Sequence, residues 1–121
     1  MNTKIKGLYG EDLAVKYLAK QKYKIISRNY TCPVGEVDIV ALDKKTLVFV
    51  EVKARTTQSF GLPREAVNKP KQWHIAKTAQ YFMHEHQVFS LETRFDVIEI
   101  LDEKINHIKN AFDFSDFGEF Y

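Results

Sequence analysis

The spacing of hydrophobic residues changes along this chain, and each spacing predicts a type of secondary structure. Apolar residues recur at helical intervals over residues 6–21 and again over residues 68–86, where Asn68 is a suitable N-cap. The short connections between the strands that follow the first helix favour an antiparallel meander. Short apolar runs rich in β-branched residues predict strands at residues 23–29, 36–42, 46–53, 94–101 and 104–112.

The order of these elements predicts the fold class. One helix, three strands, a second helix and two further strands make an α/β domain with a mixed central sheet flanked by helices. The chain has 121 residues, which is the size of a single domain. We expect this domain to occupy residues 1–111, with an acidic-aromatic tail at residues 112–121. A loop is expected over residues 54–63, followed by a short helical turn at residues 63–66.

Composition excludes several classes of protein. No apolar run exceeds four residues, so the sequence predicts neither a membrane span nor a secretory signal peptide. The single cysteine, Cys32, excludes an internal disulfide and a multi-cysteine zinc site, which favours a cytoplasmic location. The net charge is +2, but residues 1–34 carry seven Lys and Arg against two acids, and residues 53–77 carry six against one. A face that binds a polyanion and an ordinary charge-balanced surface both fit this distribution.

Four ionisable residues occupy positions where apolar residues are expected. Glu51 directly follows the apolar run at residues 47–50, and Lys53 shares its strand face. Asp38 lies on the adjacent strand, where antiparallel pairing with a small shift in register would bring it within reach of the same cation as Glu51. Glu11 lies on the apolar stripe of the first helix. Oxygen ligands on adjacent strands suit Mg²⁺, which polarises phosphoryl oxygens, and a neighbouring lysine offsets developing negative charge. The alternative is an ion pair of Glu51 and Lys53 at a strand end, with Asp38 at an edge.

Six short motifs are spaced over residues 5–101. They are Gly10-Glu11, Asn29-Tyr30, Gly35-Glu36-Val37-Asp38-Ile39-Val40, Phe49-Val50-Glu51-Val52-Lys53, Lys71-Gln72 and Arg94-Phe95-Asp96-Val97-Ile98. With these motifs the chain resembles the YraN family of small bacterial proteins. That family looks like a branch of the restriction-endonuclease-like superfamily, near archaeal Holliday-junction resolvases. The resemblance implies a restriction-endonuclease-like core of one helix, three strands, a helix and a strand, with an extra C-terminal strand.

The resemblance also implies roles for individual residues. Asp38 and Glu51 would be ligands of Mg²⁺ or Mn²⁺, and the backbone carbonyl of Val52 would be a third ligand. Lys53 would be the catalytic lysine. Glu11 would be a helix-borne acid that assists the metal directly or through water.

Further residues are candidates for contact with a nucleic acid. They lie in the loop after Lys53 or in the first turn of the second helix, where basic side chains and backbone N–H groups can hold phosphate. A soluble loop and a solvated helix start are the alternatives. Trp73 and Tyr81 can stack on unpaired bases, although such aromatic residues more often pack in a core. The phosphate candidates are Arg55, Arg64, Lys69, Lys71 and Gln72.

These features predict a Mg²⁺- or Mn²⁺-dependent nuclease that hydrolyses phosphodiester bonds, with DNA of branched or distorted structure as its partner. Recognition is expected to depend on structure and not on base sequence, because the chain has no helix-turn-helix or zinc-finger pattern. Two alternatives stay open: a non-catalytic nucleic-acid-binding module with the same fold, and a protein-interaction adaptor that uses the tail at residues 112–121. A homodimer is expected by analogy with resolvases alone.

Overall fold

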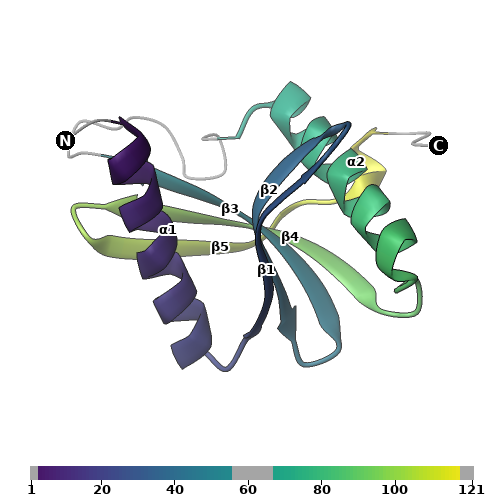
Figure 1. Ribbon diagram of the computed structural model, residues 1–121, viewed down its shortest axis with the longest axis horizontal. Helices are drawn as coiled ribbons and strands as arrows, with labels where there is room; N and C mark the ends of the chain where they lie inside the picture. Colours follow the sequence, from purple (N-terminus) through teal and green to yellow (C-terminus); the bar gives the residue numbers. More distant parts are fainter. Residues whose placement is uncertain (1–2, 56–66, 118–121) are drawn as a thin grey trace.

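A computed structural model of the chain describes residues 3–55 and 67–117 (Figure 1). The helices α1 and α2 cover opposite faces of one five-stranded sheet whose strand order is β1-β2-β3-β4-β5. Neighbouring strands are antiparallel except β3 and β4, which are parallel. The elements are α1 (Thr3–Lys20), β1 (Lys24–Cys32), β2 (Gly35–Asp43), β3 (Thr46–Arg55), α2 (Lys69–His86), β4 (Glu92–Leu101), β5 (Lys104–Phe112) and the 3₁₀ helix η2 (Phe114–Phe117).

This architecture confirms the expected restriction-endonuclease-like core. One helix, an antiparallel meander of three strands, a second helix and a parallel strand follow in the expected order, and β5 adds the extra C-terminal strand. The parallel pairing of β3 with β4 follows from α2, because parallel neighbours need a long crossover connection. No helix in the described part of the chain is long and apolar enough to cross a membrane.

Two apolar clusters hold the helices against the sheet. The α2-side cluster includes Phe49, Ile75, Phe82 and Phe95, and the α1-side cluster includes Leu18, Ile39, Val50 and Ile98, all fully or nearly fully buried. Consecutive residues of β3 alternate between the two clusters, as the pleat of a strand requires. β3 therefore lies in the centre of the molecule and is buried on both faces.

Local sequence signals set most element ends. The Asn68 side chain accepts a hydrogen bond from the backbone N of Lys71 at 2.9 Å, so Asn68 is the N-cap of α2 as predicted. Asp102 and Glu103, which join β4 to β5, both have positive φ, at 50° and 69°. That backbone conformation matches the twist of a tight two-residue hairpin.

Some predicted boundaries were wrong. β1 continues to Cys32, beyond the predicted end at residue 29, because it pairs with β2 as far as Gly35. β3 continues to Arg55, so the predicted loop does not begin at residue 54. The remainder of that loop and the helical turn predicted at residues 63–66 lie outside the described residues.

The beginning of the C-terminal tail belongs to the core. Phe112 is 5% exposed and stacks on Phe95, with ring centroids 4.9 Å apart. Phe114 meets the same ring edge-on at 5.0 Å. Phe112 and Phe114, the first two aromatic residues of the predicted tail, thus pack in the α2-side cluster.

Candidate active site

The site begins where β2 separates from β3. The β2–β3 pairing ends at Ile39 and Val50, whereas β2 stays paired with β1 down to Gly35. At the same point the alternation of side chains along β2 is interrupted, since Val37 packs in the α2-side cluster and Ile39 in the α1-side cluster. The sheet thus opens into a fork directly beyond the Ile39–Val50 pair.

Asp38 and Glu51 are the first residues inside this fork. Extension of the Ile39–Val50 register by one step places Asp38 opposite Glu51, so the register shift that the sequence prediction allowed for is not needed. Asp38 Oδ2 accepts a hydrogen bond of 2.7 Å from the backbone N of Val52. The side chain of Asp38 therefore bonds a backbone N–H at the point where the ladder between the two strands stops.

Glu51 is a buried carboxyl group with few donors. It is 5% exposed, and Lys71 Nζ lies 3.4 Å from its Oε2 without the geometry of a hydrogen bond. Oε2 receives no hydrogen bond within the described part of the chain. Burial raises the pKa of Glu51 to about 9; the hydrogen bond and charge of Asp38 raise it further, while the charges of Lys71 and Lys53 oppose the rise. The Asp38–Glu51 pair therefore retains a proton at neutral pH.

Lys53 shares the α2-side face of β3 with Glu51, and β4 places an acid beside it. In the parallel register Lys53 is the partner of Glu99, which is 8% exposed. The sequence analysis did not single out Glu99. An acid between two buried isoleucines in the strand Arg94-Phe95-Asp96-Val97-Ile98-Glu99-Ile100 was the available signal, but its position beside Lys53 depends on how β4 pairs.

Glu11 is buried, but its contacts are with β1. Its Oε1 accepts hydrogen bonds from Arg28 Nε and Asn29 Nδ2, both 3.0 Å long. Arg28 and Tyr30 of β1 pair with Ile39 and Val37 of β2, on either side of Asp38, so Glu11 bonds to the strand next to the one that carries Asp38. The expected convergence of four groups is therefore met by Asp38, Glu51 and Lys53, while Glu11 stands to one side.

A glycine allows α1 to approach this region closely. A Cβ atom on Gly10 would lie 2.8 Å from the Cβ of Ala54, so only glycine fits at this crossing of α1 and β3. Glu11 follows Gly10 and reaches β1, which means that α1 passes across the fork. The Gly10-Glu11 motif is thus explained by the geometry of the crossing.

The first turn of α2 forms another wall of the site. Lys71 extends inward to Glu51, and Gln72 Nε2 donates to the backbone carbonyl of Val67 at 2.8 Å. The buried Oε1 of Gln72 receives no hydrogen bond from any residue that the structure describes. Lys69 is exposed, Arg55 is described only through its place in β3, and Arg64 lies outside the described residues.

These residues fit a divalent cation of the Mg²⁺ type. Within residues 3–55 and 67–117 no group of three or more His, Cys, Asp or Glu side chains is arranged to hold a metal. Mg²⁺ nevertheless needs only one or two protein carboxylates, because water and substrate phosphate complete its shell. Asp38 and Glu51 supply that number, and Glu51 Oε2 is a buried acceptor without a donor. Glu36, by contrast, is exposed.

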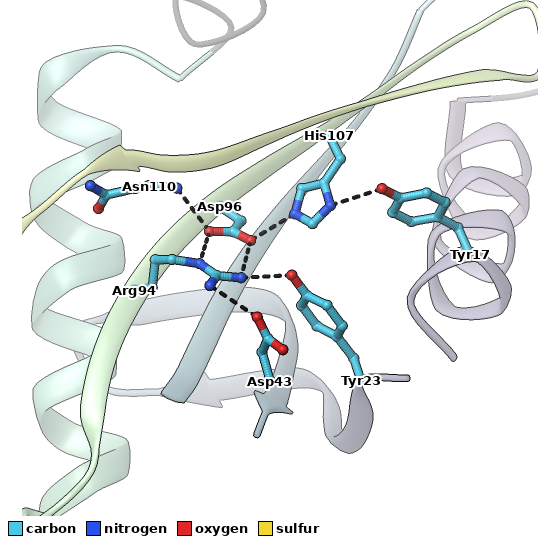
Figure 2. Close-up of polar contacts among 7 residues, drawn as sticks. All are labelled: Tyr17, Tyr23, Asp43, Arg94, Asp96, His107 and Asn110. Carbon is cyan, nitrogen blue, oxygen red and sulfur yellow. Dashed lines mark hydrogen bonds and ion pairs between the residues drawn. The ribbon is translucent and has the colours of Figure 1, made fainter. Parts of the chain in front are cut away.

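A second buried carboxylate, Asp96, lies on the α1 side of the sheet (Figure 2). Its side chain is 0% exposed and accepts a bidentate pair of hydrogen bonds from Arg94, at 2.9 and 3.0 Å. His107 Nε2 lies 2.7 Å from Oδ2, and the backbone N of Asn110 donates to Oδ1 at 3.0 Å. Burial alone would raise the pKa of Asp96, but the bonds from His107, Arg94 and Asn110 outweigh burial and lower it.

Further groups surround this second cluster and connect it to α1, to β2 and to the turn before β1. The guanidinium of Arg94 also donates to Asp43 at 3.1 Å and to the hydroxyl of Tyr23 at 2.7 Å. Tyr17 reaches from α1 to within 3.0 Å of His107 Nδ1 (Figure 2). The Asp96 cluster therefore ties α1 and β2 to β4 and β5, which indicates a structural role.

Comparisons with known proteins cover most of the chain. The family described as "Uncharacterised protein family UPF0102" matches residues 10–100. A UPF0102 protein of Caldicellulosiruptor bescii is 49% identical over 119 residues, which cover 93% of this chain and 100% of the relative. A UPF0102 protein of Caldanaerobacter subterraneus is 45% identical over 119 residues, covering 93% and 98%. A UPF0102 protein of Geobacter sulfurreducens is 48% identical over 117 residues, covering 93% and 91%.

Proposed function

The chain belongs to the UPF0102 family, which is the YraN family, and we propose that it is a Mg²⁺- or Mn²⁺-dependent nuclease that hydrolyses phosphodiester bonds in DNA. The proposal joins two arguments: the resemblance of the YraN family to restriction-endonuclease-like nucleases, and the chemistry of the fork between β2 and β3. Branched or distorted DNA is the proposed substrate, since the sequence offers no helix-turn-helix or zinc finger for base readout.

One observation carries this proposal: buried Glu51 faces Asp38, and its Oε2 has no hydrogen-bond donor among the described residues. A carboxyl group kept for stability is expected to have donors, because an unsatisfied buried acceptor costs about 1–3 kcal/mol. A divalent cation would provide the missing positive charge. The nearest basic group is Lys71 of α2, and this argues against a simple strand-end ion pair between Glu51 and Lys53.

Each residue of the fork then has a chemical role. Asp38 and Glu51 would hold the cation. The backbone carbonyl of Val52, the residue after Glu51 in β3, would be a further oxygen ligand. When bound, the cation neutralises phosphate charge and favours ionisation of the attacking water. Lys53 offsets the charge that develops on the phosphate in the transition state. Glu11 acts through water and not as a direct ligand, because Arg28 and Asn29 already hold its Oε1.

Lys71 gives the site a way to receive DNA. In the free protein its ammonium lies beside Glu51, at 3.4 Å. With a cation on the two carboxylates, the ammonium of Lys71 would be available for a backbone phosphate. Lys69, which is exposed in the same helical turn, adds a second charge for the same strand.

The test is cleavage of duplex, single-stranded, flapped and four-way DNA with Mn²⁺ or with EDTA. Wild-type protein is expected to cut in Mn²⁺ alone, and Glu51→Gln and Lys53→Ala are expected to abolish cutting. Glu36→Gln is the matched control, because Glu36 is an exposed acid on the same strand as Asp38. Cutting that survives Glu51→Gln would overturn the site. Equal DNA binding by all variants without any cutting would support the non-catalytic binding module.

A further inference from the structure

Aromatic and basic side chains that are exposed or partly exposed follow one another along α2 and just beyond its C-terminal end, and we call them the α2 row: Trp73, Lys77, Tyr81, His84 and Phe89. Trp73 and Tyr81 are each 40% exposed, and Phe89 is 61% exposed. These are large aromatic side chains in contact with water, whereas Ile75, Ala79 and Phe82 of the same helix are buried. No residue of the α2 row has a place in the proposed catalytic machinery.

Contacts between neighbouring side chains make the α2 row continuous. Lys77 Nζ lies 5.5 Å from the centre of the Trp73 ring, within the range of a cation–π interaction. Lys77, Tyr81 and His84 together line a depression of about 330 Å³. The ring of His84 in turn meets the ring of Phe89 edge-on, with centroids 5.1 Å apart. The row therefore runs from the first turns of the helix past its C-terminal end.

The turn between β1 and β2 forms the opposite side of the depression. Val34 lines it, and the backbone carbonyl of Val34 lies 3.1 Å from His74 Nδ1. A Cβ atom on Gly35 would be 2.8 Å from Thr78 Oγ1, so the turn packs closely on the helix. This close packing fixes a shallow groove of defined shape between α2 and the β1–β2 turn.

The spacing of the α2 row alternates flat apolar rings with positive charge. Residues 73, 77 and 81 are separated by four positions and share one helical face. Trp73 and Tyr81 are about 12 Å apart along the helix axis, with Lys77 midway between them. A nucleic-acid strand has the complementary pattern, because flat bases alternate with negatively charged phosphates along it.

Two further observations favour a nucleic acid over a protein as the occupant. The lysines along the row and at its beginning are Lys69 and Lys77, and Glu85 is the acid near its end. The row also begins at the end of α2 that lies beside the fork, because Lys71 in the first turn of the helix contacts Glu51.

From this arrangement we infer that the α2 row binds an unpaired nucleic-acid strand, with bases stacked on Trp73 and Tyr81 and a phosphate at Lys77. The inference rests on the proposed function in one respect: it identifies the substrate of the fork as DNA with a single-stranded segment next to the cut. Stacking of this kind tolerates any base sequence, since every base has an aromatic face.

Trp73 makes the inference directly testable, because it is the only tryptophan in the chain. A short oligothymidylate, an oligouridylate of the same length and a duplex are titrated in EDTA, and the fluorescence of Trp73 is recorded. Single strands are expected to quench it, more weakly as salt rises, and the duplex is not. Oligothymidylate is expected to bind at least as tightly as oligouridylate, and tighter binding of oligouridylate would contradict DNA as the substrate.

Two variants distinguish base stacking on Tyr81 from a general electrostatic attraction between the protein and the strand. Tyr81→Ala is expected to weaken oligothymidylate binding by about tenfold, the effect of losing one stacked base. Tyr9→Ala is the matched control: Tyr9 is a comparably exposed tyrosine, 47% exposed, on α1 across the sheet, and binding is expected to stay unchanged.

Three outcomes would overturn the inference. A labelled oligothymidylate that binds, as shown by its anisotropy, without changing Trp73 fluorescence would place the strand elsewhere. Equal affinity of Tyr81→Ala and wild type would exclude stacking. If no single strand binds, the α2 row does not bind nucleic acid, and a protein partner is then the alternative. These readouts need no metal, so loss of stacking and loss of metal-dependent cleavage are distinguished.

Discussion

Glu51 and Asp96 are two buried carboxyl groups one register step apart on neighbouring strands, and they differ in almost every other respect. Asp96 pairs with Val50 in the β3–β4 register, while Glu51 is the next residue of β3 and points to the opposite face of the sheet. Asp96 accepts hydrogen bonds from Arg94, His107 and the backbone of Asn110. Glu51 faces another carboxyl group, and its pKa is raised to about 9, whereas the pKa of Asp96 is lowered.

The comparison distinguishes Asp96, a carboxyl group that stabilises the fold, from Glu51, a carboxyl group whose burial lowers stability. A buried charge with enough donors connects the elements around it, as Asp96 does for β4 and β5. A buried carboxyl group without donors reduces stability and persists where it serves a function. The missing donors of Glu51 are therefore more informative about function than the burial that the two residues share.

The largest expected effect is on the Asp96 cluster. Asp96→Asn leaves Arg94 without its bidentate anion, and we expect it to lower the free energy of unfolding by about 3–5 kcal/mol, as for other broken buried ion pairs. Urea denaturation measures this loss. Asp102→Asn is the control, since Asp102 is an exposed turn residue with positive φ that asparagine adopts readily. Similar stability of the two variants would contradict the structural role of Asp96.

The second prediction is that substitution of Glu51, unlike that of Asp96, increases stability. The pKa of Glu51 is raised, so the folded state binds more protons than the unfolded state between about pH 4.5 and pH 9, and stability decreases as pH rises through this window. Glu51→Gln removes that decrease, and we expect it to stabilise the metal-free protein at pH 8 by about 1–3 kcal/mol. Asp96 acts oppositely: its contribution is present above its ordinary pKa of 3.8 and is lost at lower pH.

Denaturant melts in EDTA at pH 5.5 and pH 8 check this second prediction. The difference between the two pH values should be smaller for Glu51→Gln than for wild type. Glu36→Gln, the exposed control, should behave as wild type. A Glu51→Gln protein that is less stable than wild type at pH 8 would mean that the carboxyl group is satisfied after all.

The third prediction concerns metal binding at the fork. Because the Asp38–Glu51 pair retains a proton below about pH 9, binding of Mn²⁺ at pH 7.5 should release about one proton. Affinity should rise about tenfold per pH unit between pH 6 and pH 8. Calorimetry in buffers of different ionisation enthalpy counts the released protons, and Asp96→Asn, which keeps the fork, should show the same count. Metal binding without proton release would contradict the proposed ligands.

The smallest effect is expected at the edge of the Asp96 cluster. Tyr17→Phe removes one hydrogen bond to His107 and leaves the Asp96 bonds in place, so we expect a loss of about 1 kcal/mol. Tyr9→Phe removes an exposed hydrogen bond to Glu103 and should leave the melting temperature unchanged. An effect of Tyr17→Phe as large as that of Asp96→Asn would mean that the whole cluster acts as one unit.

Local patterns in the sequence predicted much of the fold. Hydrophobic periodicity gave both helices and all five strands, because the period of a helix or strand is a property of neighbouring residues. The Asn68 cap of α2 and the hairpin between β4 and β5 follow from local residues for the same reason. The pairing of Asp38 with Glu51 could also be anticipated, since a short turn leaves an antiparallel register few alternatives.

Contacts between distant segments could not be predicted in this way. Glu99 lies beside Lys53 only because α2 returns the chain to form a parallel β4, and that register is set by packing on both faces of the sheet. Glu11 bonds to Asn29, and Lys71 turns inward to Glu51, because the helices cross the sheet at particular places. The burial of Phe112 against Phe95 likewise depends on how β5 pairs.

The sequence by itself determined the secondary structure, the fold class and the residues that bring oxygen ligands and a lysine to adjacent strands. Only the tertiary structure decided which carboxyl oxygens are satisfied: both oxygens of Asp96 receive donors from β4 and β5, and Oε2 of Glu51 receives none within the described residues. The physical reason is that hydrogen-bond satisfaction depends on side chains from several elements meeting at one point. The spacing of residues along a single strand does not determine which side chains of other elements will lie beside it.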